Sequence, residues 1–115
     1  MKLIIALIQP HRVEAVKREL RKREIHRLTV LNASGYGRQK GQIKYFRGTE
    51  LESNLIDKIE IQIAVNRKFV KPAIEGIIAG ARSEEGGQTG DGKIFVIPLE
   101  ECIRISDGVK GKDAI

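Results

Sequence analysis

The sequence predicts an α+β fold in which two helices cover one face of a four-stranded antiparallel sheet. A continuous apolar run from Leu3 to Ile8 predicts one buried strand, and a strict alternation of apolar and polar residues from Lys58 to Val65 predicts another. Apolar residues recur at helical spacing after each of these strands. With one further strand in each half, the order becomes βαβ, long loop, βαβ, which is the ferredoxin-like βαββαβ sandwich.

The first half of the chain predicts strand, helix and strand. An unbroken apolar run such as Leu3 to Ile8 is typical of a central strand that is covered on both faces. From about His11 to Glu24, Val16 and Leu20 share one helical face, and charged residues occupy the rest. The segment from Leu28 to Ala33 predicts a second, weaker strand.

The second half repeats this order. After the alternating strand that ends at Val65, Asn66 is a suitable helix cap, and apolar residues at helical spacing continue from Phe69 to Ala81. Strands are predicted from Lys93 to Leu99 and again from Cys102 to Ile105. The sheet would have one face free of helices with no strand wholly polar on that side, and this favours association through the sheet.

The size and composition indicate one globular domain. The chain has 115 residues, 41% hydrophobic and 31% charged, which suits a single modest core. Its only cysteine, Cys102, has no partner for an intrachain disulfide. Lys2 is followed by six apolar residues before Gln9, a run too short for a signal peptide or a membrane span. We therefore expect a cytoplasmic protein without direct membrane insertion.

The glycine-studded stretch from Gly35 to Leu55 is the first candidate for function. A connection of roughly twenty residues without secondary structure of its own, as the pattern predicts here, is uncommon in a small domain and is often functional. Its positive charges suit an anion or a docking partner, and they come from Arg38, Lys40, Lys44 and Arg47.

A second glycine cluster, GGQTGDGK from Gly86 to Lys93, resembles a phosphate-binding loop only in part. It fits G-x-x-x-x-G-K, but Ile94 stands where a magnesium-binding Ser or Thr is required. The loop also leaves a predicted helix and enters a strand, which is the reverse of the P-loop context. The segment therefore has two possible roles. Its backbone N–H groups and Lys93 could bind phosphate, or its glycines could serve only to form the turns of a connection.

Together these segments resemble the PII signal-transduction family, small trimeric regulators of nitrogen metabolism. GYGRQKGQ followed by YFRG resembles the T-loop of that family, TGDGKIFV resembles the end of its B-loop, and RISDG with a terminal DAI resembles its C-terminal region. The resemblance covers the whole chain and implies a single PII-like domain over 1–115. Within it, the T-loop would occupy 37–55, the B-loop 82–92 and the C-terminal region 104–115.

The resemblance also implies ligands and their residues. In that family ATP and ADP compete for clefts between subunits, AMP is a further possible effector, and 2-oxoglutarate binds with a magnesium ion beside ATP. By resemblance, one side of the cleft would be lined by Thr29, Gly37, Arg38 and Ala64. Phosphate and ribose contacts would come from Gly90, Asp91, Gly92, Lys93 and Arg104. Gln39 would reach the magnesium ion, and Lys58 would pair with a carboxylate of 2-oxoglutarate.

The implied action is regulatory and not enzymatic. A homotrimer would report its bound effectors by docking the T-loop onto a membrane transporter or a metabolic enzyme. The apolar anchors of that loop would be Ile43, Tyr45, Phe46 and Leu51, and Arg47 would reach furthest into the partner.

The sequence departs from the family pattern at several positions. Leu51 stands where the family commonly carries a modifiable tyrosine, and Thr49 stands where some members carry a phosphorylated serine, so only phosphorylation remains chemically possible. Gln88 and Ser106 replace two cations, and each lost charge-assisted contact weakens phosphate binding by roughly 1.5–3 kcal/mol. The chain therefore resembles a divergent PII-like branch.

The sequence disfavours two other function classes. A net charge of +6 would suit a small basic nucleic-acid-binding domain. However, the six basic residues of 12–24 are interleaved with three glutamates, and the predicted sheet lacks aromatic pairs for base stacking. An enzyme is also disfavoured, because His11 and His26 have no metal-ligand spacing and no nucleophile and base stand out together.

Overall fold

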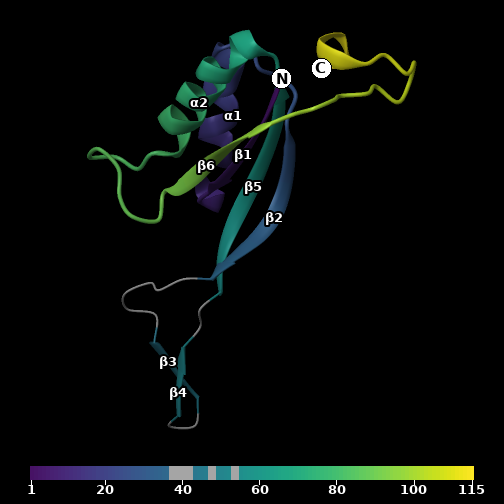
Figure 1. The fold of residues 1–115 in the computed structure, drawn as a ribbon. Helices are drawn as coiled ribbons and strands as arrows, with labels where there is room; N and C mark the ends of the chain where they lie inside the picture. The colour runs from purple at the N-terminus through teal and green to yellow at the C-terminus, as the bar shows by residue number, and fades with distance from the viewer. Residues whose placement is uncertain (37–42, 47–48, 53–54) are drawn as a thin grey trace.

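The computed structural model describes residues 1–36, 43–46, 49–52 and 55–115, with side chains for 1–36 and 55–115 (Figure 1). The elements are β1 (Lys2–Ile8), a 3-10 turn (Pro10–Arg12), α1 (Val13–Lys22), β2 (Thr29–Tyr36), β3 (Ile43–Phe46), β4 (Thr49–Glu52), β5 (Leu55–Val65), α2 (Arg67–Ala81), β6 (Gly92–Pro98) and a short 3-10 helix (Gly111–Ala114).

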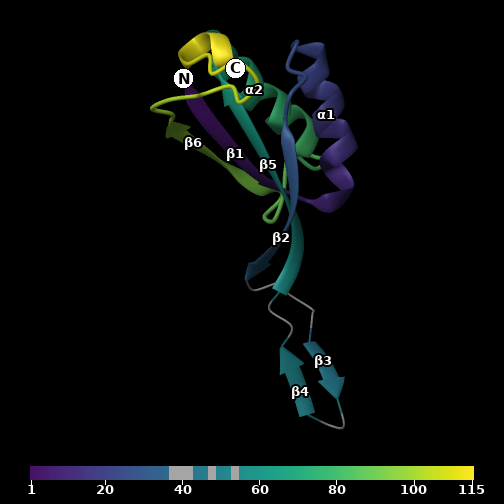
Figure 2. The same ribbon diagram turned by 90° about the vertical axis from the view of Figure 1, so that its right-hand side faces the viewer.

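Four strands form one antiparallel sheet in the order β2-β5-β1-β6. At its centre Ile4 lies between Ile63 of β5 and Val96 of β6. Helices α1 and α2 lie side by side on one face of this sheet in both ribbon views (Figures 1 and 2). The predicted ferredoxin-like α+β fold is confirmed.

The core lies between the helices and the sheet. Every second residue of β1 and β5 points into it, and the largest fully buried side chains are Ile4, Ile8, Leu20, Ile61, Ile63, Ile77 and Val16. The two helices approach closely at Gly80, where a Cβ atom would lie 2.5 Å from the Cα of Val16. Glycine is needed there because a side chain would push the helices apart.

The opposite face of the sheet carries no helix. Part of it is polar, because Lys58, Glu60 and Gln62 of the central strand β5 alternate with its buried isoleucines. Beside it the face is apolar: Ile5 of β1 lies next to Phe95 of β6, whose exposed fraction is 44%. This face thus offers apolar surface to a partner.

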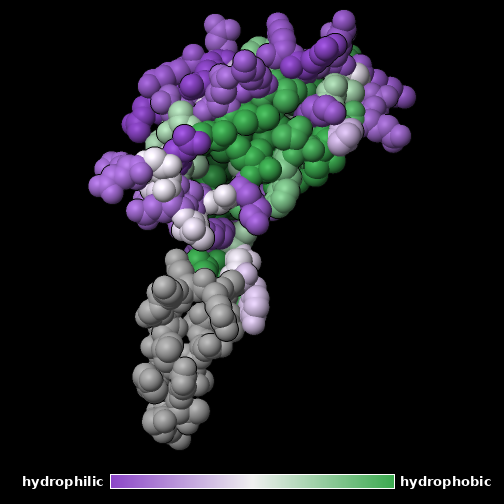
Figure 3. Space-filling model, turned by 60° about the vertical axis from the view of Figure 1, so that its left-hand side comes forward, coloured by the Kyte–Doolittle hydropathy of each residue, from purple (hydrophilic) through white to green (hydrophobic). Residues whose placement is uncertain are grey.

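A second apolar surface lies between α2 and β6. A groove of about 490 Å³ is lined there chiefly by Leu7, Ile8, Ile74, Ile77, Ile78, Ile94 and Val96, and its lower end reaches Asp91 and Lys93. Figure 3, which brings this side forward, shows a hydrophobic area in the middle of the domain with hydrophilic residues above it. β6 is an edge strand of the sheet, so nothing within the described part of the chain covers its outer side.

The long connection between β2 and β5 has secondary structure of its own, so that part of the prediction is wrong. β3 and β4 pair as an antiparallel hairpin with Phe46 opposite Thr49, and the hairpin projects away from the sheet (Figures 1 and 2). Aromatic and β-branched residues such as Tyr45 favour strands, and two residues suffice to turn a hairpin. The abundance of glycine and charge around the hairpin concealed this signal.

The strand predicted for Cys102–Ile105 is also wrong. The segment pairs with itself through one bridge between Ile103 and Lys110, closed by hydrogen bonds from the N–H of Arg104 to the carbonyl of Val109 and from the N–H of Gly111 to the carbonyl of Cys102. Gly108, with φ +73°, makes the turn possible. The β-forming residues therefore build a small turn and do not extend the sheet.

Asn66 precedes α2 as predicted, but its side chain does not cap the helix. Its Nδ2 donates instead to the carbonyl of Lys112 at 3.1 Å, and the N–H of Leu99 donates to the carbonyl of Met1. These bonds fix the C-terminal segment beside the N-terminus, at the end of the sheet opposite the hairpin (Figure 2).

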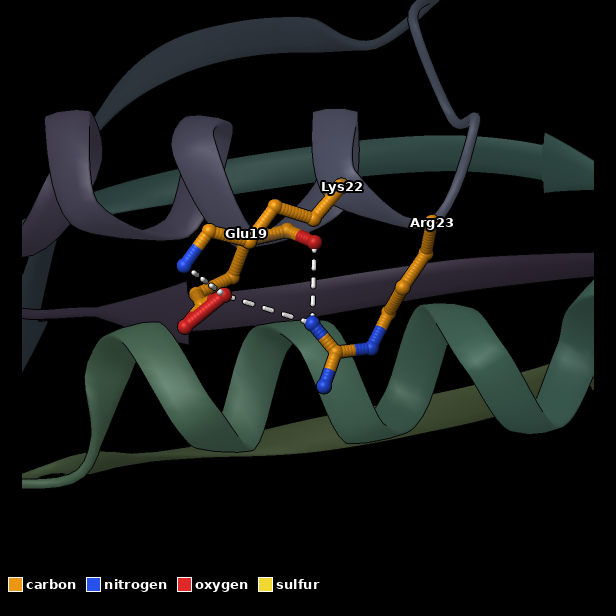
Figure 4. A network of polar contacts seen from close by, with 3 residues as sticks. All are labelled: Glu19, Lys22 and Arg23. Carbon is orange, nitrogen blue, oxygen red and sulfur yellow. Dashed lines mark hydrogen bonds and ion pairs between the residues drawn. The ribbon is translucent and has the colours of Figure 1, made fainter.

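The charged face of α1 is organised by ion pairs within the helix. Glu19 accepts from Lys22 at 3.3 Å and from Arg23 at 3.4 Å, and Arg23 also donates to the Glu19 carbonyl (Figure 4). The bond from Lys22, with the nearby charges of Lys22 and Arg23, holds the pKa of Glu19 below its ordinary value. Lys17 pairs with Glu14 in the same way. None of the helices in the described ranges is long and apolar enough to cross a membrane.

Candidate functional site

Residues 82–92, the expected B-loop, meet β5 at the lower end of the sheet. Gly90 lies just before β6, and its carbonyl accepts two side-chain hydrogen bonds. One comes from Nε2 of Gln9 at 2.7 Å and the other from Nζ of Lys58 at 2.9 Å. The two donors come from β5 and from the residue after β1, so the loop is tied to the sheet at a site rich in hydrogen-bond donors.

Asp91 organises the inside of the same loop. Its Oδ2 accepts from the N–H of Ser83 at 3.0 Å, from the hydroxyl of Ser83 at 3.0 Å and from the N–H of Gln88 at 2.9 Å. The backbone bonds from Ser83 and Gln88 hold the pKa of the Asp91 carboxyl below its ordinary value of 3.8, and Arg12 adds a smaller electrostatic contribution in the same direction. Asp91 therefore holds the segment around Ser83 and Gln88 against the end of the loop.

This assignment predicts how the Asp91 carboxyl titrates. Because the pKa of Asp91 is lowered in the folded protein, the stabilisation from its hydrogen bonds is fully present above pH 3.8. That stabilisation is lost as the pH falls through the lower pKa of the folded state. In Ser83→Ala the hydroxyl donor is gone while both backbone donors remain, so the pKa of Asp91 should rise part of the way toward its ordinary value. Side-chain carboxyl NMR measures this directly. A pKa that does not move would contradict the role given to the hydroxyl.

The glycines of the loop allow close backbone contact with β1. Gly90 has φ +101° and Gly92 has φ +121°, both in the region that favours glycine. A Cβ atom at Gly92 would lie 1.8 Å from the carbonyl oxygen of Leu7, so no other residue fits without moving the strand. Lys93 follows at once and is exposed, and within the described side chains it has neither a hydrogen-bond nor an ion-pair partner. Its ammonium group is available to an anion.

The predicted nucleotide residues fall into two separate groups on the sheet. Gly90, Asp91, Gly92 and Lys93 lie at the lower end together with Lys58. Ala64 pairs with Leu3 at the upper end, and Thr29 opens the outer strand β2 opposite Gln62, which pairs with Ile5 midway along β1. Leu3 and Ile8 lie five residues apart along β1, a distance of roughly 17 Å. One chain does not bring the two groups together. Gly37, Arg38 and Gln39 lie outside the described residues.

Arg104 belongs to the upper group. It lies in the segment after β6, which is bonded to Met1 through Leu99 and to Asn66 through Lys112. This segment runs at the end of the sheet away from the B-loop (Figures 1 and 2). Its Nη1 donates to Oδ2 of Asp107 at 2.8 Å, and its Nη2 donates to the carbonyl of Asp113. The guanidinium is thus held in a fixed direction by its own segment, and it does not reach Lys93 in the same chain.

The predicted partner-binding residues lie on the projecting hairpin. Ile43, Tyr45 and Phe46 are on β3, and Thr49 and Leu51 are on β4. Arg47 lies outside the described residues. The backbone therefore presents this segment at the far end of the molecule from the C-terminal region (Figure 1).

Sequence reasoning missed Gln9 and Ser83. Both are polar residues at the point where a predicted element ends, Gln9 after β1 and Ser83 after α2. The register places Ile8 opposite Ile59 and Gly92, so that Gln9, the next residue, reaches Gly90, but this register is not visible in the sequence. Within the described ranges, no three His, Cys, Asp or Glu residues are grouped to hold a metal ion.

Comparison with known proteins adds the family. The family model described as "Nitrogen regulatory protein P-II" matches residues 1–109. Nitrogen regulatory protein GlnK1 of Methanosarcina mazei is 52% identical over 115 residues, covering 100% of this chain and 97% of the relative. Nitrogen regulatory protein P-II of Azospirillum brasilense is 43% identical, with 100% of both chains covered.

A solved structure agrees with these relatives. The crystal structure of Arabidopsis thaliana PII bound to citrate matches with a TM-score of 0.78 and 30% identity, covering 98% of this chain and 87% of that one. The family match, the relatives and the fold all extend over nearly the whole chain. The chain therefore belongs to the P-II family of nitrogen regulatory proteins and is a signal-transducing regulator rather than an enzyme.

Proposed function

We propose that this regulator binds adenine nucleotides at the interfaces between its own copies and controls a membrane transporter or a metabolic enzyme through its T-loop, residues 37–55. The observation that carries the proposal is the lower end of the sheet, where the glycine-rich end of the B-loop, the free ammonium of Lys93 and the ammonium of Lys58 lie together. Ammonium groups and bare glycine amides are the donors that phosphate oxygens need.

The site is proposed to be completed by a second copy of the chain. Ala64 and the segment of Arg104 lie at the upper end of the sheet, and Thr29 lies on the outer strand β2, so they serve the same nucleotide only if they come from a neighbour. An interface that joins the upper end of one copy to the lower end of the next is heterologous, and such an interface closes into a ring when the rotation between copies closes. With the helix-free, partly apolar sheet face to be covered, this supports a homotrimer.

A small carboxylate is the second proposed effector. Lys58 offers the positive charge that a carboxylate of 2-oxoglutarate requires, with Gln39 toward an accompanying magnesium ion and the nucleotide phosphates. The Arabidopsis relative was crystallised bound to citrate, which is a carboxylate of the same chemical class. Since Lys58 already donates to Gly90, a carboxylate must share or replace that contact.

The affinity for nucleotide is proposed to be modest, with little preference for ATP over ADP. Gln88 and Ser106 stand where two phosphate-binding cations are usual in the family, and both are exposed. Each absent charge-assisted bond weakens triphosphate binding by roughly 1.5–3 kcal/mol. The remaining cations, Lys93 and Arg104, serve ATP, ADP and AMP alike.

Calorimetry and light scattering test this function together. We expect a trimer in solution, with one adenine-nucleotide site per chain and similar affinities for ATP and ADP. Titrations of ATP, ADP, AMP and cyclic AMP, each with and without 2-oxoglutarate and magnesium, identify the effectors. A monomer at micromolar concentration, or no heat with any adenine nucleotide, would reject the proposal. Much tighter binding of ATP than of ADP would reject only the argument from missing cations.

A further inference from the structure

The carbonyl of Gly90 is held by two side chains that belong to neither the B-loop nor β6. Gln9 donates to it at 2.7 Å from the residue after β1, and Lys58 donates at 2.9 Å from β5. Three segments that are far apart in the sequence, at positions 9, 58 and 90, therefore meet at one oxygen atom. We call Gln9 and Lys58 together the Gly90 clamp.

The clamp acts where the loop has few other ties to the sheet. Ser83 and Gln88 are joined to Asp91, but these bonds lie within the loop and its flanks. At Gly92 the strand begins against Leu7. Between these points, the described bonds that fix the loop to the sheet are those of the clamp, and Gly90 at φ +101° has the backbone freedom to turn its peptide if they break.

We propose that Gln9 and Lys58 are positioning residues for the B-loop, because together they hold the carbonyl of Gly90. Lys58 then acts on the nucleotide site even when no carboxylate effector is present. Gln9, which the family resemblance did not single out, shares this role through the same oxygen atom. The effect on the loop stands on the observed contacts alone, whereas the effect on nucleotide affinity rests on the function proposed above.

The physical basis is preorganisation. A ligand that binds one loop conformation loses affinity in proportion to the fraction of molecules that have left it. The bond from Lys58 is charge-assisted and that from Gln9 is neutral, and both are exposed to solvent. Two donors on one acceptor also provide redundancy, so the loss of either leaves the carbonyl partly held. The largest effect therefore requires removal of both.

Amide hydrogen exchange of the ligand-free protein tests the clamp without any nucleotide. The reporters are the amides of Gln88 and Asp91, which are bonded within the loop to Oδ2 of Asp91 and to the carbonyl of Gln88. Gln9→Met and Lys58→Met remove one donor each while keeping the length of the side chain. Each should speed exchange by roughly two- to tenfold, and the double variant should speed it by more than either.

Matched controls separate the clamp from general effects of charge and polarity. Lys17→Met removes a lysine from α1 that pairs only with Glu14. Gln62→Met removes a glutamine of β5 that donates only to Glu60. Neither control should change exchange in the loop. A double variant whose loop amides exchange no faster than those of Lys17→Met overturns the proposal.

Gln9→Glu tests the competition for Lys58. Glutamate has the shape of glutamine, but its carboxylate donates no bond to Gly90 and offers Lys58 an anionic partner in place of the carbonyl. It should therefore loosen the loop more than Gln9→Met does. Exchange in Gln9→Glu that is no faster than in Gln9→Met overturns the competition.

Titration with ADP in the absence of any carboxylate tests the link to the ligand. The double variant should bind ADP more weakly than the wild type, by no more than the factor found in exchange. Faster exchange with unchanged ADP affinity would overturn the positioning role toward the nucleotide. If the wild type itself binds no ADP while the double variant still exchanges faster, the proposed function fails and the clamp on the loop stands.

Discussion

Gly92→Ala is expected to destabilise the folded protein by about 2–6 kcal/mol and to abolish nucleotide binding. Two effects add at this position. A φ of +121° strains any residue with a side chain, and the new methyl group would lie 1.8 Å from the carbonyl oxygen of Leu7. Because Gly92 is the first residue of β6, the strand must move away from β1 to relieve the clash, and Lys93 moves with it.

The matched control for this substitution is Gly86→Ala. Gly86 lies in the same loop and also has a positive φ, of +87°, but nothing lies within 4 Å of its added Cβ. Gly86→Ala should therefore lose only the stability that a side chain at positive φ costs, about 1–2 kcal/mol. Urea unfolding at a fixed protein concentration compares the two variants, since stability depends on concentration in an oligomer. Equal losses of stability would contradict the contact with Leu7.

Lys93→Ala is expected to weaken adenine-nucleotide binding by at least about tenfold, with the fold intact. The ammonium of Lys93 is exposed and has no partner within the described side chains, so its removal breaks no internal bond and should leave the unfolding midpoint nearly unchanged. Lys17→Ala changes the net charge equally on the far side of the helices and should bind as the wild type does. Calorimetry with ADP measures both variants, and an unchanged affinity in Lys93→Ala would contradict the placement of the phosphates.

The layout of the sheet was predictable because its residues follow simple periods. The alternation from Lys58 to Val65 and the apolar run from Leu3 to Ile8 predicted the two central strands, and the helical spacing before Ala81 predicted α2. Pairing decided what the sequence could not. The segments Ile43–Phe46 and Cys102–Ile105 are both rich in strand-forming residues. The first pairs with β4 in a hairpin outside the sheet, whereas the second makes a single bridge through Ile103.

The site was predictable only as far as its residue types were. The glycines beside Lys93 predicted an anion-binding site, and the family resemblance predicted a carboxylate-binding role for Lys58. The register that brings Gln9 and Lys58 to one carbonyl depends on tertiary structure, as does the separation of Lys93 from Arg104. The three bonds to Asp91 likewise depend on how the loop folds back onto Ser83. A single polar residue at the end of a strand carries no sequence signal of such a role.

Mixing two defective chains tests most directly whether the nucleotide site is built from two copies. Lys93→Ala and Arg104→Ala should each bind nucleotide poorly as homotrimers. In trimers assembled from equal amounts of both chains, about a quarter of the interfaces join an intact Lys93 to an intact Arg104 of the neighbour. Calorimetry should then recover wild-type affinity at about a quarter of the sites. If mixed trimers form and no site regains that affinity, the two residues do not share a nucleotide between subunits.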